Sequence, residues 1–203
     1  MDQLTLRPAR ADDAPRIAAI HCASWRDTYS NVLSPEFLAG PIEQNRSELW
    51  AARLAAPDEA RQVLVADSLG IGPAAFLSAY CDADAQWGSL IENLHVSPAL
   101  RGQKIGERLI RSAASALAAQ AKATGVYLWV FEANQAGLRF YQRLGGQVVE
   151  RSTSKLAEAK GATILRVAWP ALDALRVSAE ARSACRNPCD RSAQGRAVAP
   201  AAP

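Results

Sequence analysis

The sequence predicts a single α/β (α+β) domain with a central, mostly antiparallel but mixed sheet of about six to seven strands and about four flanking helices. Three observations lead to this prediction. The chain has 203 residues, 49% of them hydrophobic, which allows one sizeable core and is short for two ordinary domains. Short apolar or alternating stretches recur along the chain. Longer stretches with apolar residues at helical spacing lie between them, so we expect a domain over residues 1–170.

The N-terminal half is expected to begin with a strand and two helices and to continue with three further strands. The strands are expected at 4–9, 61–67, 74–80 and 89–97. One helix begins after Asp12 and Asp13, and a second runs over 42–56, behind a loop with proline and glycine breakers. The last three strands read as an antiparallel meander with short turns. Apolar residues on both faces of the third predict that it lies in the middle of the sheet.

The C-terminal half predicts two more helices and the remaining strands. A helix is expected from Ile105 to Thr124-Gly125, and a shorter one over 134–144. A strand over 126–131 separates them, and a terminal strand pair follows at 147–150 and 163–168. Beyond Pro170 the chain is rich in Ala, Arg, Ser and Pro, so we expect 171–203 to be a disordered tail that buries too little to offset its ordering entropy.

Composition argues against several classes of function. The formal net charge of +3 is too modest for a nucleic-acid-binding surface, so we expect no nucleic-acid partner. The chain has no long apolar run and its first residues do not resemble a signal peptide, which predicts a cytoplasmic protein without membrane contact. Cys185 and Cys189 supply only half of a zinc ligand set and have no histidine nearby, so no metal is expected.

The sharpest motif is a basic, glycine-containing loop between a buried strand and a long helix. Its residues are Arg101, Gly102, Gln103, Lys104, Ile105 and Gly106. The first amides of a helix have no partners within the helix, and together with the helix dipole they attract phosphate groups. Small residues let the backbone approach such a group. The loop therefore predicts an anion site, and the alternative is a basic turn ahead of a solvated helix.

This loop resembles the pyrophosphate loop of the GCN5-related N-acetyltransferase (GNAT) superfamily, commonly written [Arg/Gln]-x-x-Gly-x-[Gly/Ala]. Lys104 stands where the pattern has its first Gly, at a cost on the order of 1 kcal/mol if the position needs a positive φ. The stretch 134–146 resembles the family's Asn-x-x-Ala-x-x-x-Tyr helix with its closing Leu-Gly turn, and Gly137 replaces the Ala. The resemblance covers roughly residues 4–168 and implies the GNAT fold.

The resemblance also implies a reaction. The enzyme would bind acetyl-CoA, as acyl donor, and pass the acetyl group to a primary amine that attacks the thioester directly. The strand residues Leu94, His95 and Val96 would bind the acyl-donor arm, with backbone hydrogen bonds from Leu94 and Val96. Asn134 would lie near the pantetheine. Tyr141, about two helical turns further on the same face, would protonate the departing thiolate; the alternative for it is a packed aromatic.

Glu92 is the candidate general base. Strand alternation predicts that it shares a face with Leu94 and Val96, where desolvation would raise its pKa toward a useful range. The alternative is a hydrogen-bonded structural glutamate. His95 is expected on the opposite face, as a core imidazole or as a direct participant. By resemblance, Trp25, Tyr29 and the loop 30–37 would line the acceptor site, although residues at this helical spacing also read as packing.

Two other classes of function compete with this one. A domain that binds acyl-CoA without turnover, as a sensor or scaffold, is disfavoured by Tyr141. A dinucleotide-binding unit would need G-x-G-x-x-G after an early strand, whereas this loop offers only Gly102 and Gly106, after several strands. The sequence leaves open whether the acceptor is a small molecule or a protein amine, and whether the protein is a monomer or a homodimer.

Overall fold

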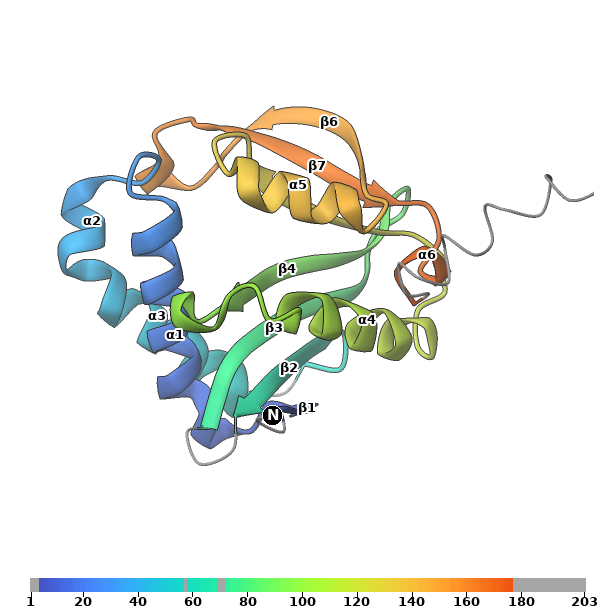
Figure 1. The fold of residues 1–203 in the computed structure, drawn as a ribbon, viewed down its shortest axis with the longest axis horizontal. Helices are drawn as coiled ribbons and strands as arrows, with labels where there is room; N and C mark the ends of the chain where they lie inside the picture. Colours follow the sequence, from blue (N-terminus) through green and yellow to red (C-terminus); the bar gives the residue numbers. More distant parts are fainter. Residues whose placement is uncertain (1–3, 57, 69–71, 177–203) are drawn as a thin grey trace, which may run out of the picture.

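The computed structural model describes residues 4–56, 58–68 and 72–176. Its centre is a seven-stranded sheet in the order β1-β2-β3-β4-β5-β7-β6 (Figure 1). The strands are β1 Leu4–Pro8, β2 Arg61–Ser68, β3 Gly72–Asp84, β4 Gly88–Val96, β5 Val126–Phe131, β6 Gln147–Thr153 and β7 Thr163–Trp169. Neighbouring strands are antiparallel except β4 and β5, which are parallel.

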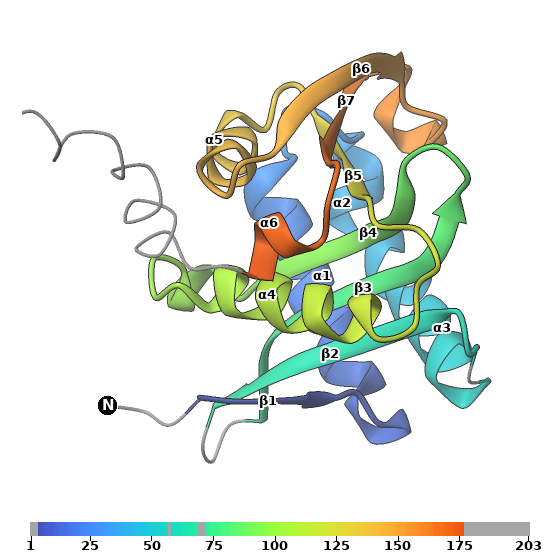
Figure 2. The same cartoon turned by 90° about the vertical axis from the view of Figure 1, so that its right-hand side faces the viewer.

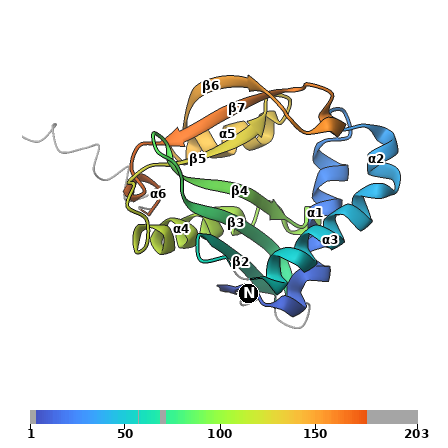
Figure 3. The ribbon, with the colours of Figure 1, turned by 180° about the vertical axis from the view of Figure 1, so that it is seen from behind.

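Helices cover both faces of the sheet. They are α1 Ala14–Thr28, α2 Pro35–Ala39, α3 Pro41–Ala55, α4 Ile105–Ala118, α5 Gln135–Arg143 and α6 Asp173–Arg176, with short 3-10 turns at Ala11–Asp13, Pro98–Leu100 and Ala157–Ala159. The larger apolar core lies between one face of the sheet and the helices α4 and α5 that cover it (Figure 1). A second core joins α1 and α3 to β2 and β3 on the other face (Figure 3).

The sheet splits between β4 and β5. Pairing between them is confined to Ser89 with Val126 and Leu90 with Tyr127. Beyond these pairs β4 follows β3 while β5 follows β7, so the two halves of the sheet diverge (Figure 2). Among the described residues, the backbone of β4 beyond Leu90 therefore has no strand partner on the side that faces β5.

The predicted strands are all present, and the strand expected in the middle of the sheet is β4, its fourth strand. One helix prediction and one loop prediction were wrong. The helix expected to reach Thr124-Gly125 ends at Ala118, and the carboxylate of Asp82 then accepts hydrogen bonds from the amides of Lys122 and Ala123, both at 3.0 Å. The segment expected to be a loop forms α2, whose N-terminus is capped by the Ser34 hydroxyl at 3.1 Å from the Phe37 amide.

The packed part of the chain continues past Pro170. Leu172 and Leu175 are buried in the larger core, and Arg111 donates a hydrogen bond to the Leu175 carbonyl at 2.8 Å. The rest of the predicted tail, with Cys185 and Cys189, lies outside the described residues. Within those that are described, none of the helices is long and apolar enough to cross a membrane.

Candidate active site

Two cavities meet where the sheet splits. One, which we call the helix cavity, has a volume of about 740 Å³ and lies among β4, the β4–α4 loop, α1 and α5. The other, the sheet cavity, has a volume of about 600 Å³ and lies among α1 and the strands β4, β5, β6 and β7. Tyr29, Leu94, His95 and Tyr141 line both cavities. These four side chains therefore mark the junction.

The β4–α4 loop brings the start of α4 to the helix cavity. Lys104 is the N-cap residue of α4 and has a left-handed backbone, with φ of 59°, so the steric cost considered for a side chain at this position applies. The helix has no side-chain cap, so its first amides keep their donors for another group. A methyl group on Gly106 would stand 3.5 to 3.8 Å from Phe140, Val96 and Leu94, in ordinary van der Waals contact, so this position lies directly against the wall of the cavity.

All the predicted loop residues except Gln103 line the helix cavity; Gln103 is exposed. Arg101 reaches from the loop to α1, where it contacts the carboxylate of Asp27 and lies 3.3 Å from the Thr28 hydroxyl. The loop is therefore tied to the first helix of the chain. Sequence reasoning missed Asp27 and Thr28, because no local pattern connects them with a loop so far along the chain.

Asn134 organises the opposite wall of the helix cavity. Its Oδ1 accepts a hydrogen bond from the amide of Gly137 at 2.9 Å and so caps α5. Its Nδ2 donates to the hydroxyl of Tyr29 at 3.2 Å. A side chain at position 137 would come within 2.7 Å of Asn134 Nδ2, so Gly137, where the family pattern has Ala, leaves room for this orientation.

The phenols of Tyr141 and Tyr29 face the junction. The Tyr141 ring packs edge-on against Phe140 and Trp169, with ring centroids 5.2 and 6.3 Å apart. Burial raises the pKa of Tyr141, and the nearby Tyr29 raises it further. Burial likewise raises the pKa of Tyr29, against the lowering effect of the Asn134 hydrogen bond. Both hydroxyls therefore keep their protons at neutral pH and can donate them.

The predicted face of Glu92 was wrong because β4 contains a bulge. Ser78 pairs with Asn93 and Ala79 pairs with Ile91, so Glu92 is the extra residue. The bulge reverses the alternation, and Glu92 points toward α3, away from the core face on which Leu94 and Val96 lie. His95, expected opposite Glu92, lies on the same face as Glu92, against α1.

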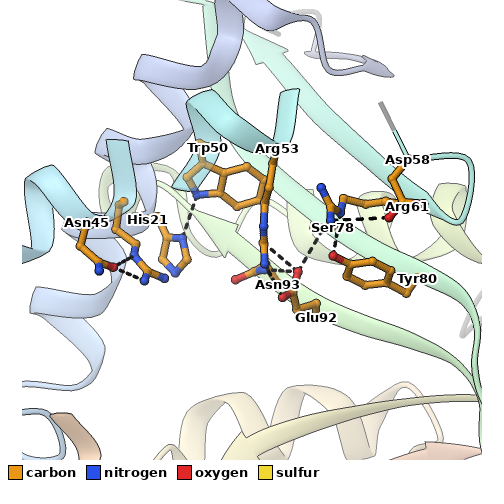
Figure 4. A network of polar contacts seen from close by, with 11 residues as sticks. His21, Asn45, Trp50, Arg53, Asp58, Arg61, Ser78, Tyr80, Glu92 and Asn93 are labelled. Atoms are coloured by element: carbon orange, nitrogen blue, oxygen red, sulfur yellow. Dashed lines mark hydrogen bonds and ion pairs between the residues drawn. The ribbon is translucent and has the colours of Figure 1, made fainter. Parts of the chain in front are cut away.

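Both carboxylate oxygens of Glu92 are engaged. Arg53 Nη2 lies 2.6 Å from Oε1, and Arg53 Nη1 lies 2.8 Å from Oε2 (Figure 4). Asn93 Nδ2 donates to Oε2 at 3.1 Å, and the Ser78 hydroxyl lies 3.4 Å from it. Glu92 lines the sheet cavity, and its carboxylate there is already paired with Arg53. Its role as general base stays a prediction.

Two buried histidines stack behind the junction. The rings of His95 and His21 lie 4.4 Å apart, and His95 Nδ1 is 3.0 Å from the Ser24 hydroxyl. Trp50 Nε1 donates to His21 Nδ1 at 3.1 Å (Figure 4), so the proton of the neutral His21 ring is on Nε2. Burial lowers the pKa of His95 to about 3 and that of His21 well below its ordinary value.

Trp25 and Tyr29 both line the sheet cavity, and Tyr29 also packs against Phe131 with ring centroids 5.1 Å apart. Their role in binding an acceptor stays a prediction. Sequence reasoning missed the far wall of this cavity, which includes Trp129, Phe131, Ser152, Lys155 and Arg166. The alternation along the last strands could have assigned these residues to one face, except Lys155, which follows β6. No local sequence pattern indicated that this face lies opposite α1.

In the described ranges no group of His, Cys, Asp and Glu could hold a metal ion.

Comparison with known proteins then identifies the family. The model of the acetyltransferase (GNAT) family matches residues 18–146, which is more than half of the chain and includes both cavities' junction residues. The chain belongs to the GNAT acetyltransferase family. This GNAT protein is accordingly an N-acetyltransferase, and its seven-stranded mixed sheet with flanking helices is the fold of that family.

Individual relatives agree with this assignment. The uncharacterized N-acetyltransferase YuaI of Bacillus subtilis is 25% identical over 178 residues, which are 85% of this chain and 96% of that protein. The PaiA N-acetyltransferase of Thermoplasma acidophilum, solved with coenzyme A, is similar in fold at 18% identity, with a TM-score of 0.66 over 81% of this chain and 98% of that one. Arabidopsis thaliana NAA60, solved with acetyl-CoA, has a TM-score of 0.59 at 19% identity over 82% and 98% of the two chains.

The left-handed Lys104 leads to a stability prediction. Replacing Lys104 by Gly should raise the free energy of unfolding by about 0.5–1 kcal/mol, because glycine adopts a positive φ without a Cβ penalty. Lys122→Gly is the matched control: it removes the same side chain from an exposed loop position where φ is not positive, and it should lower stability. Urea denaturation of the three proteins measures both effects. A loss of stability in Lys104→Gly equal to that of the control would contradict the strain.

The buried histidines lead to a prediction on pH dependence. In the folded protein their pKa values lie below the value of 6.5 that they have in the unfolded chain. As the pH falls, the unfolded chain therefore binds more protons than the folded one. The contribution of the neutral histidines to stability is complete above pH 6.5 and is lost below it. Between pH 7.5 and 5.5 the buried His95 should therefore lower the free energy of unfolding by on the order of 1 kcal/mol, and the buried His21 should lower it further. The drop should be clearly smaller in His95→Gln than in the wild type. Equal drops in the two proteins would show that His95 is not held neutral.

Proposed function

We propose that this GNAT enzyme uses acetyl-CoA as donor, bound in the helix cavity, and transfers the acetyl group directly to a primary amine bound in the sheet cavity. The proposal rests on the side chains that the two cavities share at their junction. Tyr29, Leu94, His95 and Tyr141 line both cavities, so a thioester and an amine entering from opposite sides would meet beside a buried phenol that keeps its proton. Direct transfer requires such a meeting point.

The residues of the helix cavity fit a pyrophosphate with an extended arm. Uncapped amides at the start of α4, the small residues Gly102 and Gly106, and the ammonium of Lys104 suit the phosphates. In the part of the chain that the structure describes, no strand pairs with β4 beyond Leu90 on the side toward β5, so the backbone of Leu94 and Val96 can bind the pantetheine as an added strand would. Asn134 closes the opposite wall.

In the proposed reaction the neutral amine attacks the thioester carbonyl, a C–N bond forms and the C–S bond breaks. Tyr141 donates its hydroxyl proton to the leaving sulfur. The proton lost by the amine goes to Glu92, which is the proposed base and reaches the sheet cavity beside Asn93. His95, the other candidate on this face, is a weak base, because burial lowers its pKa to about 3. Proton exchange with solvent restores the phenol and the carboxylate.

The acceptor is a small-molecule or protein amine in this proposal. A cytoplasmic location, and a monomeric or homodimeric state, stay predictions. The alternative function is a domain that binds acyl-CoA without turnover. The buried phenol at the junction favours turnover, because a binding domain has no need of a proton donor at the point where the two cavities meet.

Replacing Tyr141 by Phe tests the proposal. The variant should bind acetyl-CoA within about threefold of wild type, because the lost hydroxyl contributes little to ground-state binding, while kcat falls by about 10²–10⁴, the range of general-acid catalysis. Thiol release with a panel of amines measures kcat, and calorimetry measures binding.

Tyr29→Phe is the matched control, since it removes a buried phenol at the same junction. It deletes only the hydroxyl that accepts from Asn134, so kcat should fall by less than about tenfold. Binding of acetyl-CoA without thiol release from any amine would favour the sensor. Equal losses in the two variants would remove Tyr141 from its assigned role.

A further inference from the structure

We infer that the acceptor is a monoamine on an aromatic or branched apolar body, and that polycationic amines such as polyamines and aminoglycosides are rejected. This inference rests on the proposed function and names the substrate class of the same site. It follows from two properties of the sheet cavity: its wall is rich in aromatic rings, and every carboxylate in its wall already has a cationic partner from this chain.

The aromatic wall surrounds the junction. Trp25, Tyr29, Trp129, Phe131 and Tyr141 contribute to the lining from α1, β5 and α5. Several of these rings hold one another in place: Trp25 and Tyr29 meet edge-on at 6.2 Å, and Tyr29 meets Phe131 edge-on at 5.1 Å. Rings fixed in this way offer flat faces and edges to an apolar body without a loss of their own freedom. Each apolar group that an acceptor buries here adds to its binding.

The carboxylates of the lining are Glu92 and Glu150. Arg53 binds Glu92 through both carboxylate oxygens, at 2.6 and 2.8 Å. Arg166 Nε lies 3.0 Å from Glu150 Oε2, a charge contact without hydrogen-bond alignment. Arg166 is itself held in place, since its guanidinium lies 4.7 to 5.3 Å from the ring centres of Trp87, Tyr127 and Trp129. Neither carboxylate is left without a cation.

The remaining charge of the lining also disfavours a second ammonium group. Lys155 is exposed at the start of the loop after β6, and in the described part of the chain no ion pair involves it. A polycation needs unpaired carboxylates along its length, because each desolvated ammonium without a partner costs free energy. The sheet cavity instead presents one free cation and two neutralised acids. A single amine can enter as the neutral nucleophile, with its apolar body against the rings.

A panel of amines tests the inference on the full chain. Phenethylamine and isoamylamine represent apolar monoamines, and spermidine and kanamycin represent polycations. We expect kcat/KM for phenethylamine to exceed that for spermidine by at least about tenfold, and to change little between 50 and 300 mM salt. Spermidine or kanamycin as the better acceptor overturns the inference and leaves the proposed function standing. Acetyl-CoA binding without thiol release from any amine overturns both.

A variant that frees a carboxylate of the lining tests whether charge pairing is the reason why polycations are rejected. Arg53→Met leaves Glu92 without its cation, so the spermidine to phenethylamine ratio of kcat/KM should rise by about tenfold, even if both rates change. Arg26→Met is the matched control: it removes a cation of the neighbouring helix α1, whose partner Glu43 does not line the sheet cavity, and the ratio should stay within about twofold.

A surface variant keeps the test decisive if Arg53→Met fails to fold. Lys155→Glu replaces the free cation of the lining by a free carboxylate at an exposed position, and should raise the same ratio by about threefold. Added salt should cancel this gain. If the ratio is unchanged in Lys155→Glu and in a folded Arg53→Met, charge pairing does not set the substrate class and the inference is wrong.

Discussion

The site depends on how β4 leaves β5. Two residue pairs join these parallel strands, and then each strand follows its other neighbour. An edge formed in the middle of a sheet exposes backbone donors and acceptors that need partners. At the same place the bulge at Glu92 turns Glu92 and His95 to one face and leaves Leu94 and Val96 on the other. One irregular strand thus separates the two cavities and supplies residues to both.

Burial and pairing determine the protonation state of the groups around the junction. Burial lowers the pKa values of His95 and His21 and raises those of Tyr29 and Tyr141, so all four side chains are neutral near pH 7. The ionised groups nearby are paired instead, as Glu92 is with Arg53. Both results follow from the cost of an unpaired charge away from water. A transfer that needs a neutral amine and a proton-bearing phenol suits such surroundings.

Local sequence patterns predicted most of the fold, because alternation, caps and glycine positions act within a few residues. The β5 range was correct to the residue. The loop pattern singled out Lys104, which stands where the pattern has a glycine, and this residue has a positive φ. The bulge escaped prediction because it depends on how β3 pairs with β4, and strict alternation then assigned Glu92 to the wrong face. The partner of Glu92 was equally hidden, since Arg53 lies 39 residues away in the sequence, in helix α3.

Helix α1 links the two halves of the site. On the side of the helix cavity, Asp27 and Thr28 hold Arg101 of the β4–α4 loop, and Tyr29, directly after α1, accepts the hydrogen bond of Asn134 at the start of α5. On the side of the sheet cavity, Trp25 and Tyr29 form part of the aromatic wall. A helix with regular hydrogen bonds moves as a unit, so a displacement of this aromatic wall would also displace the contacts in the helix cavity. The packing of α1 against α3 and β3, with Trp50 and Phe76 in the shared core, therefore holds the two cavities in register with each other.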